Sequence, residues 1–517
     1  MITRSGAMIG AKRSSSAITK SRQPRSKKSK KSPDTPKPSN SSRKRRGGTQ
    51  TIPQPLLKRS PSPPSISNST IDDLPDLVLV EIFCRLPHNK VAFGCKLVSK
   101  RWRTLLSDPY FVCKFVRLQR DQQKPLLKSY VMVPYRDAKQ KTLVLTLSPK
   151  PPHPVFEIET SISSILSFLP CFQGDDYAGK EDDFDVVGIY NDLVLCSPNF
   201  SFQRDYYICN SYTKEWVRLP PTFPMGELLL PIGLVCDPYY NIKEDSTDIK
   251  LNAQYRCRVV RILPNGLPNS PRNEGFYVEI FSSETGKWRE YPSSKEFCKQ
   301  RRRFTSFSKC PGVACNGKLY WWNRDGNVFE LDPFNISSNG DVICGFIDAP
   351  AEGRPKGYKH IGVCRGRLRM CPDLINGSGS DPIIIWELNE NQVDGKPKWC
   401  LIFNEVSLSE MIQKQPFITP DQWQTDNFKM VGFHPNHGDI VFLQFSSVRS
   451  HPRCIFMCNL RQKTLEIATK IPFEKSPDDV YWSSCKGTHP YVIPWWPTPV
   501  PRKLDYHEDL RSTSMSL

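Results

Sequence analysis

Apolar and polar residues alternate in two different ways along the chain, and the change falls near residue 125. Residues 71–116 carry apolar side chains at helical spacing, which predicts three short helices. Beyond residue 125, short β-branched and aromatic runs are separated by turns rich in Pro, Gly, Asn and Asp. That texture is typical of an all-β region. The pattern therefore predicts a small helical module followed by a larger β domain, and we expect the two regions to have separate cores.

The first predicted helix lies in the segment LPDLVLVEIFCRLP at residues 74–87 and is apolar almost all the way round. Pro75 suits the first helical turn, Glu81 and Arg85 form an i, i+4 pair, and Pro87 ends the helix. A module of about 45 residues is too small to bury every face of such a helix, so the surplus apolar surface indicates a partner. Periodicity alone favours the alternative, an ordinary small helical core. A second apolar set follows at Val91, Phe93, Leu97, Val98, Trp102, Leu105 and Leu106.

Two kinds of hairpin recur in the β region. Strand, two-residue turn and strand are predicted in GIYNDLVLC at 188–196, GVACNGKLYW at 312–321 and GVCRGRLRM at 362–370. A polar turn followed by a second strand recurs in YYICNSYTKEWVRLPP at 206–221, YVEIFSSETGKWREY at 277–291 and IFMCNLRQKTLEIAT at 455–469. The fifty-residue spacing of the last two Gly-led copies suits one propeller blade of four strands. Generic hairpins in a sandwich or barrel remain the alternative.

Specific residues in the helical module carry a family resemblance. The run DLPDLVLVEIFCRLP…CKLVSKRWRTLLSDPYF, within residues 72–111, closely resembles the F-box of plant F-box proteins. The resemblance implies a three-helix module that docks onto the Skp-type adaptor of a cullin ubiquitin ligase. It also implies that the adaptor is bound by Leu74, Pro75, Leu79, Ile82, Leu86, Val98 and Trp102.

One departure from the F-box pattern concerns the middle helix. The spacing between Pro87 and Trp102 is about one residue longer than the family pattern, and Gly94 lies inside the expected helix. Because Gly costs about 1 kcal/mol relative to Ala in a helix, we expect this helix to be short or irregular.

The β region resembles the F-box-associated domain of plant F-box proteins, a kelch-like β-propeller. The similarity is carried by LVLCSP…YYICNSYTKEWVRLPP, GVACNGKLYWW…VFELDPF, VGFHPNHGDIVFL and the closing YVIPWWPTPVP. Regular kelch repeats are not present, so the number of blades stays open. The expected organisation is a tail at 1–70, an F-box at 71–116, a linker at 117–130, a propeller-like domain at 131–501 and a second disordered tail at 502–517.

Positive charge is concentrated in the first seventy residues. They contain seventeen Lys or Arg against one acid, and so supply +16 of the formal net charge of +20. Their Ser- and Pro-rich, apolar-poor composition predicts disorder. Two basic clusters suggest nuclear import, and their members are Lys27, Lys28, Lys30 and Lys31 in the first and Arg43, Lys44, Arg45 and Arg46 in the second. A solvated tail and an organelle transit peptide are the alternatives. The remaining chain is nearly neutral, so we expect no specific nucleic-acid binding.

Candidate chemistry is sparse. No nucleophile or phosphate-binding motif occurs, and no run of about 18 apolar residues predicts a membrane span. His434 and His437 in HPNHGD lack an evident third metal ligand, and the segment is interpreted as a polar hairpin turn. No cofactor, metal or catalytic residue is expected. Several cysteines inside apolar runs are interpreted as reduced, buried side chains: Cys84, Cys196, Cys209, Cys315 and Cys364.

These observations favour a non-catalytic adaptor in the nucleus or cytoplasm. Its F-box would hold the Skp-type adaptor, and through it a cullin ligase, while its β domain would hold an unknown target protein. The alternative is a ligand-binding or enzymatic β-propeller with a helical cap.

Overall fold

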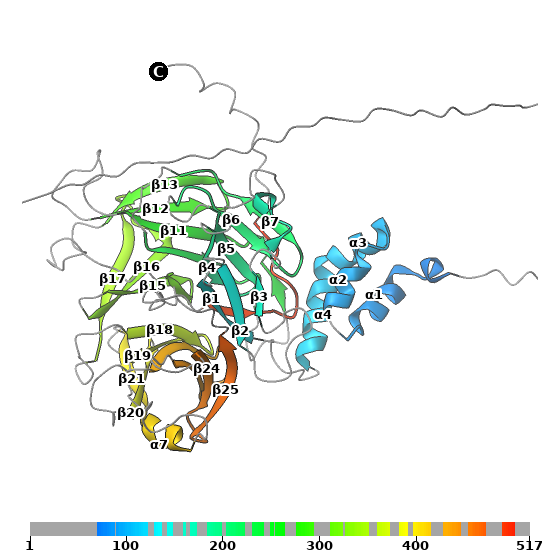
Figure 1. Cartoon of the computed structure of the whole chain (residues 1–517). Coiled ribbons are helices and arrows are strands. Elements are labelled where there is room, and N and C mark those ends of the chain that lie inside the picture. Colours follow the sequence, from blue (N-terminus) through cyan, green and yellow to red (C-terminus); the bar gives the residue numbers. More distant parts are fainter. Residues whose placement is uncertain are drawn as a thin grey trace, which may run out of the picture. The chain divides into compact units, whose positions relative to one another are not determined.

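A computed structural model of the chain describes most of the region from Thr70 to Pro501 (Figure 1). The described residues are 70–87, 89–121, 129–136, 142–147, 159–161, 166–172, 184–198, 203–222, 230–241, 249–252, 254–263, 276–293, 311–323, 326–350, 359–372, 382–390, 397–414, 428–445, 453–471 and 489–501. The basic clusters of the first seventy residues and the predicted C-terminal tail lie outside them. None of the described helices is long and apolar enough to cross a membrane.

The helical region holds four helices after a short 3-10 turn, one helix more than the sequence predicted. They are η1 (Ile71–Asp73), α1 (Asp76–Cys84), α2 (Asn89–Cys95), α3 (Lys100–Ser107) and α4 (Pro109–Asp121). The Ser-Asp-Pro sequence starts the extra helix, because Asp108 Oδ1 accepts a hydrogen bond from Tyr110 N at 2.7 Å and Pro109 occupies the first helical position. The expectation of a short middle helix is confirmed, since α2 has seven residues.

The described β region contains six four-stranded antiparallel sheets and one two-stranded sheet (Figure 1). Each four-stranded sheet has one edge strand innermost, and the strands follow from it outward in a fixed order. In that order the sheets are β26 (His489–Val492), β1 (Ser129–Arg136), β2 (Thr142–Leu147), β3 (Glu159–Ser161); β4 (Asp185–Tyr190), β5 (Leu193–Ser197), β6 (Tyr207–Asn210), β7 (Glu215–Arg218); β8 (Ile232–Cys236), β11 (Cys257–Leu263), β12 (Tyr277–Ser282), β13 (Lys287–Pro292); β14 (Val313–Cys315), β15 (Lys318–Asn323), β16 (Asn327–Ile336), β17 (Val342–Asp348); β18 (Lys359–Cys364), β19 (Arg367–Pro372), β20 (Pro382–Asn389), β21 (Lys398–Ser407); and β22 (Phe428–Phe433), β23 (Ile440–Phe445), β24 (Arg453–Asn459), β25 (Thr464–Ile471).

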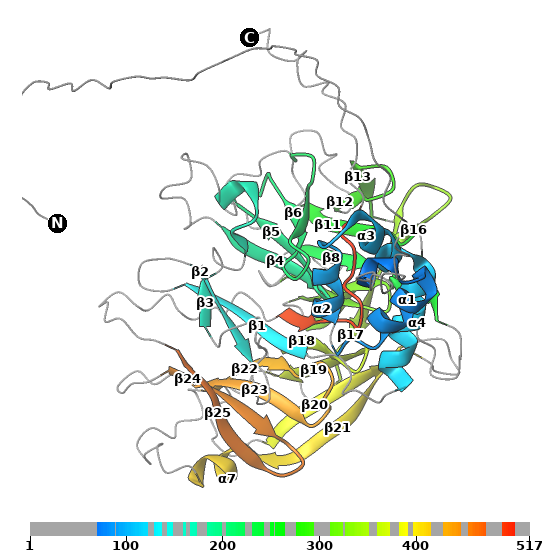
Figure 2. The ribbon, with the colours of Figure 1, turned by 90° about the vertical axis from the view of Figure 1, so that its right-hand side faces the viewer.

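The sheets form a closed ring, which is the arrangement of a β-propeller. Innermost strands contact one another in the order β4, β8, β14, β18 and β22, and the last sheet returns through β1 and β26 to β4. Closure joins distant parts of the chain, because β26, red in Figure 2, pairs with β1. In this pairing Tyr491 lies opposite Tyr130. The minor elements are β9 (Tyr240–Asn241), β10 (Lys250–Leu251), η2 (Pro170–Phe172) and α7 (Leu408–Gln413). The propeller prediction is confirmed, and the sandwich alternative is excluded.

The two hairpin types found in the sequence occupy two positions in each sheet. The Gly-led copies are inner hairpins, β4–β5, β14–β15 and β18–β19, whereas the polar-turn copies are outer hairpins, β6–β7, β12–β13 and β24–β25. Asn316 and Gly317 both have positive φ, 48° and 78°, as a two-residue hairpin turn requires. The leading glycine allows blades to approach, since a Cβ at Gly362 would lie 2.9 Å from the Phe433 ring of the next blade.

Apolar clusters fill the spaces between neighbouring sheets. Leu195 and Tyr206 of one sheet share a cluster with Leu234 and Val259 of the next, and the same pairing repeats around the ring. The five cysteines predicted to be buried thiols are buried and unbridged: Cys84, Cys196, Cys209, Cys315 and Cys364. Neighbouring blades therefore share their apolar cores.

The helical module and the β region share a core, although the sequence suggested two separate ones. Trp496, from the segment after β26, lies among the rings of Phe93, Phe111 and Phe115 at centroid distances of 5.0, 5.6 and 5.4 Å. Ile249 beside β10 belongs to the same cluster. The expectation of separate cores was wrong, because sequence patterns cannot show that a residue nearly 400 positions away completes the helical core.

Hydrogen bonds fix the segment that carries Trp496. Asn89 Nδ2 donates to the Pro494 carbonyl at 3.1 Å, and Asp192 Oδ2 accepts from Thr498 N at 3.0 Å. Asn210 Nδ2 donates both to Asp192 Oδ2 at 2.7 Å and to the Thr498 carbonyl at 3.0 Å. The segment therefore links the F-box-like helices to the β4–β7 sheet.

Candidate functional site

Helix α1 uses two opposite faces. Leu79, Val80, Phe83 and Cys84 face the core and are buried, while the side chains of Leu77, Val78 and Ile82 are 76%, 43% and 39% exposed. At 3.6 residues per turn, the exposed residues share one side of the helix with Glu81 and Arg85. The all-round apolar character of the segment thus reflects one face that packs and one that remains uncovered.

The two halves of the helical motif are held together by Arg101 and Trp102. Arg101 donates to Asp76 Oδ1 at 2.6 Å, to the Leu74 carbonyl at 2.6 Å and to the Asp72 carbonyl. Trp102 Nε1 donates to Asp72 Oδ1 at 3.1 Å. Ser99 Oγ caps α3 by accepting from Trp102 N. These polar contacts fix the start of α1 against α3.

Exposed apolar side chains concentrate in this module. Of ten large apolar side chains that are exposed in the described part of the chain, eight fall within residues 71–110. We call these eight residues the exposed apolar set: Ile71, Leu77, Val78, Ile82, Val91, Leu97, Val98 and Tyr110. The other two, Ile343 and Leu401, lie on the outermost strands β17 and β21.

A polar group borders the exposed side of α1. Glu81 pairs with Arg85 at 3.0 Å, as the sequence predicted, and with Lys114 of α4 at 2.6 Å. The hydrogen bonds from Lys114 and Arg85 lower the pKa of the Glu81 carboxyl. An apolar face edged by an ordered charge cluster matches the core and rim of a protein interface.

The seven residues predicted to bind the adaptor divide into three groups. Pro75, Ile82 and Val98 are exposed, while Leu74 and Leu86 are half-buried against the core. Leu79 and Trp102 are buried, with 0% and 8% exposure, and Trp102 packs edge-on against Phe83 at 4.8 Å. Those two side chains therefore pack in the core of the module and support it from inside. The exposed residues Leu77, Val78 and Leu97 are not among the seven, although the surplus of apolar positions on α1 pointed to the first two.

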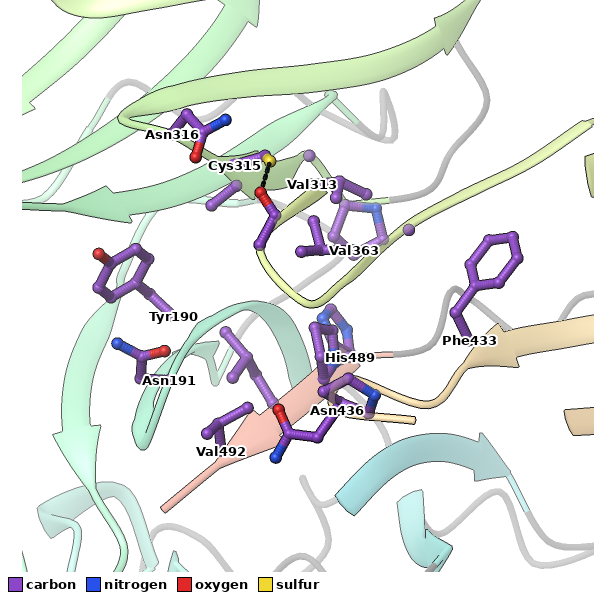
Figure 3. A pocket seen from close by; sticks show the side chains of 18 of the residues that line it. Tyr190, Asn191, Val313, Cys315, Asn316, Val363, Phe433, Asn436, His489 and Val492 are labelled. Carbon is purple, nitrogen blue, oxygen red and sulfur yellow. Dashed lines mark hydrogen bonds between the residues drawn. The ribbon is translucent and has the colours of Figure 1, made fainter. Parts of the chain in front are cut away.

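A cavity of about 290 Å³ lies at the innermost strands of the propeller (Figure 3). Its lining comes from β4, β14, β18, β22 and β26 and from the turns of the inner hairpins. Most lining groups are apolar, and Tyr190, Val313, Val363, Phe433 and Val492 are among the side chains labelled in Figure 3. No local pattern in the sequence indicates this site, because its residues are spread over about 300 positions.

Two imidazoles line the cavity, those of His360 and His489. Burial lowers the pKa of each to about 4, against a hydrogen bond to Val186 that acts in the opposite direction on His489. Both rings are therefore neutral near pH 7. The Nε2 atom of His489 is buried and has no hydrogen-bond partner among the described residues.

Cys315, also in the lining, donates its thiol to the Gly366 carbonyl at 3.3 Å. Burial raises the pKa of this thiol to about 12. Cys315 thus remains a protonated thiol at neutral pH and does not offer an activated nucleophile.

His434 and His437 lie in the turn between β22 and β23, as predicted. His434 Nδ1 accepts hydrogen bonds from Asn436 N and His437 N, both at 3.1 Å, so the imidazole closes the turn. Within the described ranges no group of three or more His, Cys, Asp or Glu side chains is placed to hold a metal ion.

Comparison with known protein families follows the same division of the chain. The family model described as "F-box protein At3g26010-like, beta-propeller" matches residues 160–502, and the F-box domain model matches residues 71–114. The chain belongs to this family of F-box proteins. Its helical module is an F-box, and its β-propeller is of the family's type.

Curated relatives from Arabidopsis thaliana agree with this assignment. F-box protein At5g49610 is 29% identical over 257 residues, which cover 48% of this chain and 57% of that protein. F-box protein At5g07610 is 22% identical over 384 residues, covering 71% of this chain and 80% of the relative. The chain thus spans little more than half the length of the first of these relatives.

Among solved structures, TolB from Acinetobacter baumannii has a TM-score of 0.33 and 9% identity, covering 77% of this chain and 73% of that chain. Similarity this weak carries no argument about fold or function.

Proposed function

We propose that this protein is a substrate receptor of a Skp-cullin-F-box ubiquitin ligase. The F-box docks onto a Skp-type adaptor, and the propeller binds the target protein. The observation that carries the proposal is the concentration of exposed apolar side chains in residues 71–110, where the F-box match also falls.

The exposed apolar set supports docking on energetic grounds. Burying apolar surface contributes about 25 cal/mol of favourable free energy per Å². Leu77 and Leu97 are 76% and 81% exposed, so covering them with a partner would contribute favourably to the free energy of binding. Their neighbours Leu79 and Trp102 are buried in the F-box core and hold the helices in place. Adaptor binding thus depends on an exposed layer supported by a packed one.

The proposed role requires no chemistry from this chain. Ubiquitin transfer to the target is accelerated by proximity, because the receptor holds the target near the ligase. Burial raises the pKa of the Cys315 thiol to about 12 and lowers the pKa of His360 and His489 to about 4, so the thiol is not activated and the two imidazoles are weak bases. These features favour the adaptor over an enzymatic propeller.

The test is a titration of the full chain with a purified Skp-type adaptor. Leu77→Asp and Leu97→Asp place a charge in the proposed interface and should each weaken binding by about tenfold or more, with little change in folding stability. Ile343→Asp and Leu401→Asp are matched controls, because these side chains are 51% and 44% exposed on the propeller. Equal affinity of all four variants and the wild type would reject the docking face.

A further inference from the structure

The cavity at the propeller axis takes no part in adaptor docking, since its lining residues are all in the β region. No Asp, Glu, Lys or Arg is among the described residues that line it. Arg365, in the β18–β19 turn, donates Nε to the Asn436 carbonyl at 3.1 Å and is not part of the lining. The described wall of the cavity therefore presents no formal charge.

Among the described lining residues, a charged group entering this cavity would lose its water without meeting a counter-charge. His360 and His489 add no positive charge to this lining, because burial disfavours protonation of both rings and the charge of Lys429 acts in the same direction on His360. Transfer of an unpaired ion into such surroundings is strongly unfavourable, whereas an apolar group gains free energy there. The described lining therefore favours an uncharged occupant.

The volume of the cavity limits which uncharged groups it can hold. About 290 Å³ lies at the lower end of ligand pockets, which range over roughly 300–1,000 Å³. It suits one large side chain better than a nucleotide or another extended cofactor. Asn191, Asn316 and Asn436 come from turns of three inner hairpins and add carboxamide groups to the lining (Figure 3). Such groups suit the hydrogen-bonding needs of the peptide chain that carries an inserted side chain.

We propose that this axial cavity binds a large, uncharged apolar side chain of the target protein, and that a phosphorylated side chain is excluded from it. The proposal rests on the proposed receptor function and names the chemical class of the recognised segment. It places target recognition on the axis of the propeller, at inner strands from five of the six sheets.

The test uses two amino-acid amides of similar size with the full chain. N-acetyl-phenylalaninamide carries an uncharged ring, and N-acetyl-O-phosphotyrosinamide carries a phosphate on the corresponding ring. Binding is measured by saturation-transfer NMR on the probe signals. The phenylalanine amide should bind to the wild type, and the phosphotyrosine amide should not.

Variants that fill the cavity locate the binding. Val492 is the residue of choice because its neighbours Tyr491 and Ile493 are buried in a core cluster, whereas Val492 lines the cavity (Figure 3). Val492→Phe should weaken phenylalanine amide binding by about tenfold, as should Val363→Phe from another blade. Ile343→Phe, on the outermost strand β17, is the matched control and should bind as the wild type does.

The outcomes for the cavity are separable from those for the receptor function. Loss of the probe signal in a filling variant with an unchanged melting temperature supports the cavity. The proposal is overturned if neither amide binds to the wild type, if the phosphotyrosine amide binds as well as the phenylalanine amide, or if both filling variants retain the probe. Adaptor binding by the same wild-type preparation is measured in parallel. If the preparation binds the adaptor while one of these three results is obtained, the cavity proposal is rejected and adaptor docking is not.

Discussion

The F-box leaves much of its apolar surface exposed, whereas the propeller buries most of its own. The F-box exposes eight large apolar side chains within forty residues, whereas the described part of the much longer propeller exposes two. The propeller can bury its apolar faces between neighbouring blades, while four short helices cannot cover all of theirs. Their difference indicates that the F-box is built to be completed by other surfaces.

One of those surfaces comes from the same chain. Trp496 and Ile249 complete the inner side of the F-box core, and the exposed apolar set remains for a partner. Lys96 reinforces the junction, since its ammonium group lies 4.3 Å from the Phe93 ring centroid and 5.1 Å from that of Trp496. Burial lowers the pKa of Lys96 there. The F-box is thereby fixed to the propeller through its inner side, which leaves its outer side for the proposed adaptor.

The largest expected effect tests this junction. Trp496→Ala removes a side chain that is 3% exposed and contacts three aromatic rings. Loss of the ring and the cavity it leaves should lower the free energy of unfolding by about 3–5 kcal/mol, measured by chemical denaturation. Tyr110→Ala is the control, because that side chain is 61% exposed. A loss below about 1 kcal/mol for Trp496→Ala would show that the F-box core does not depend on this segment.

The next largest effect distinguishes the buried face of α1 from its exposed face. Leu79→Ala should destabilise the protein by about 2–5 kcal/mol, because Leu79 is fully buried. Leu77→Ala should change stability by less than about 0.5 kcal/mol yet weaken adaptor binding by about 1–2 kcal/mol. Denaturation and adaptor titration of both variants provide the comparison. Similar stability losses for the two would contradict the two-faced helix.

A smaller effect concerns the buried histidines of the propeller. Burial lowers the pKa of His360 to about 4, below its ordinary value of 6.5, so the unfolded chain binds this proton more readily. Stability is therefore lost as pH falls from 6.5 toward 4. Between pH 7 and pH 5 the expected loss is about 2 kcal/mol for this imidazole.

Replacing the imidazole isolates that contribution. Asp192 acts in the opposite direction, because burial raises its pKa to about 6. The quantity to measure is thus the difference between wild type and His360→Met in the change of unfolding free energy from pH 7 to pH 5. His437→Gln, at an exposed position of the β22–β23 turn, is the control. An identical pH dependence in wild type and His360→Met would show that His360 does not remain neutral in the folded protein.

The smallest effect on binding is expected from the basic tail. Glutamine at the eight positions Lys27, Lys28, Lys30, Lys31, Arg43, Lys44, Arg45 and Arg46 should leave adaptor affinity within about twofold, because the proposed interface lies in residues 71–110. We propose that the same change reduces the nuclear fraction of a fluorescent fusion. An unchanged distribution would remove the import role, and a large loss of affinity would place the tail in the interface.

Sequence patterns predicted the structure where local signals determine it. The inner hairpin at Asn316 and Gly317, the Glu81–Arg85 pair and the closed β ring all follow from short-range signals or repeated units. The same patterns failed where distant segments meet. Nothing local shows that Trp496 enters the F-box core or that His360 and His489 line one cavity.

The division of α1 was only partly predictable. The excess of apolar residues indicated two uses for the helix, but family matching assigned Leu79 and Trp102 to the adaptor face. Their burial follows from contacts with Phe83 and its neighbours, which depend on the packing of α1 against α3. Helix propensity and spacing do not contain that information.

Hydrogen exchange of the full chain, with and without a purified Skp-type adaptor, tests the central claim most directly. We predict complex formation and slower exchange in residues 71–110, with no change in the β14–β17 blade. Failure to form a complex, or protection confined to the propeller strands, would contradict adaptor docking by the F-box.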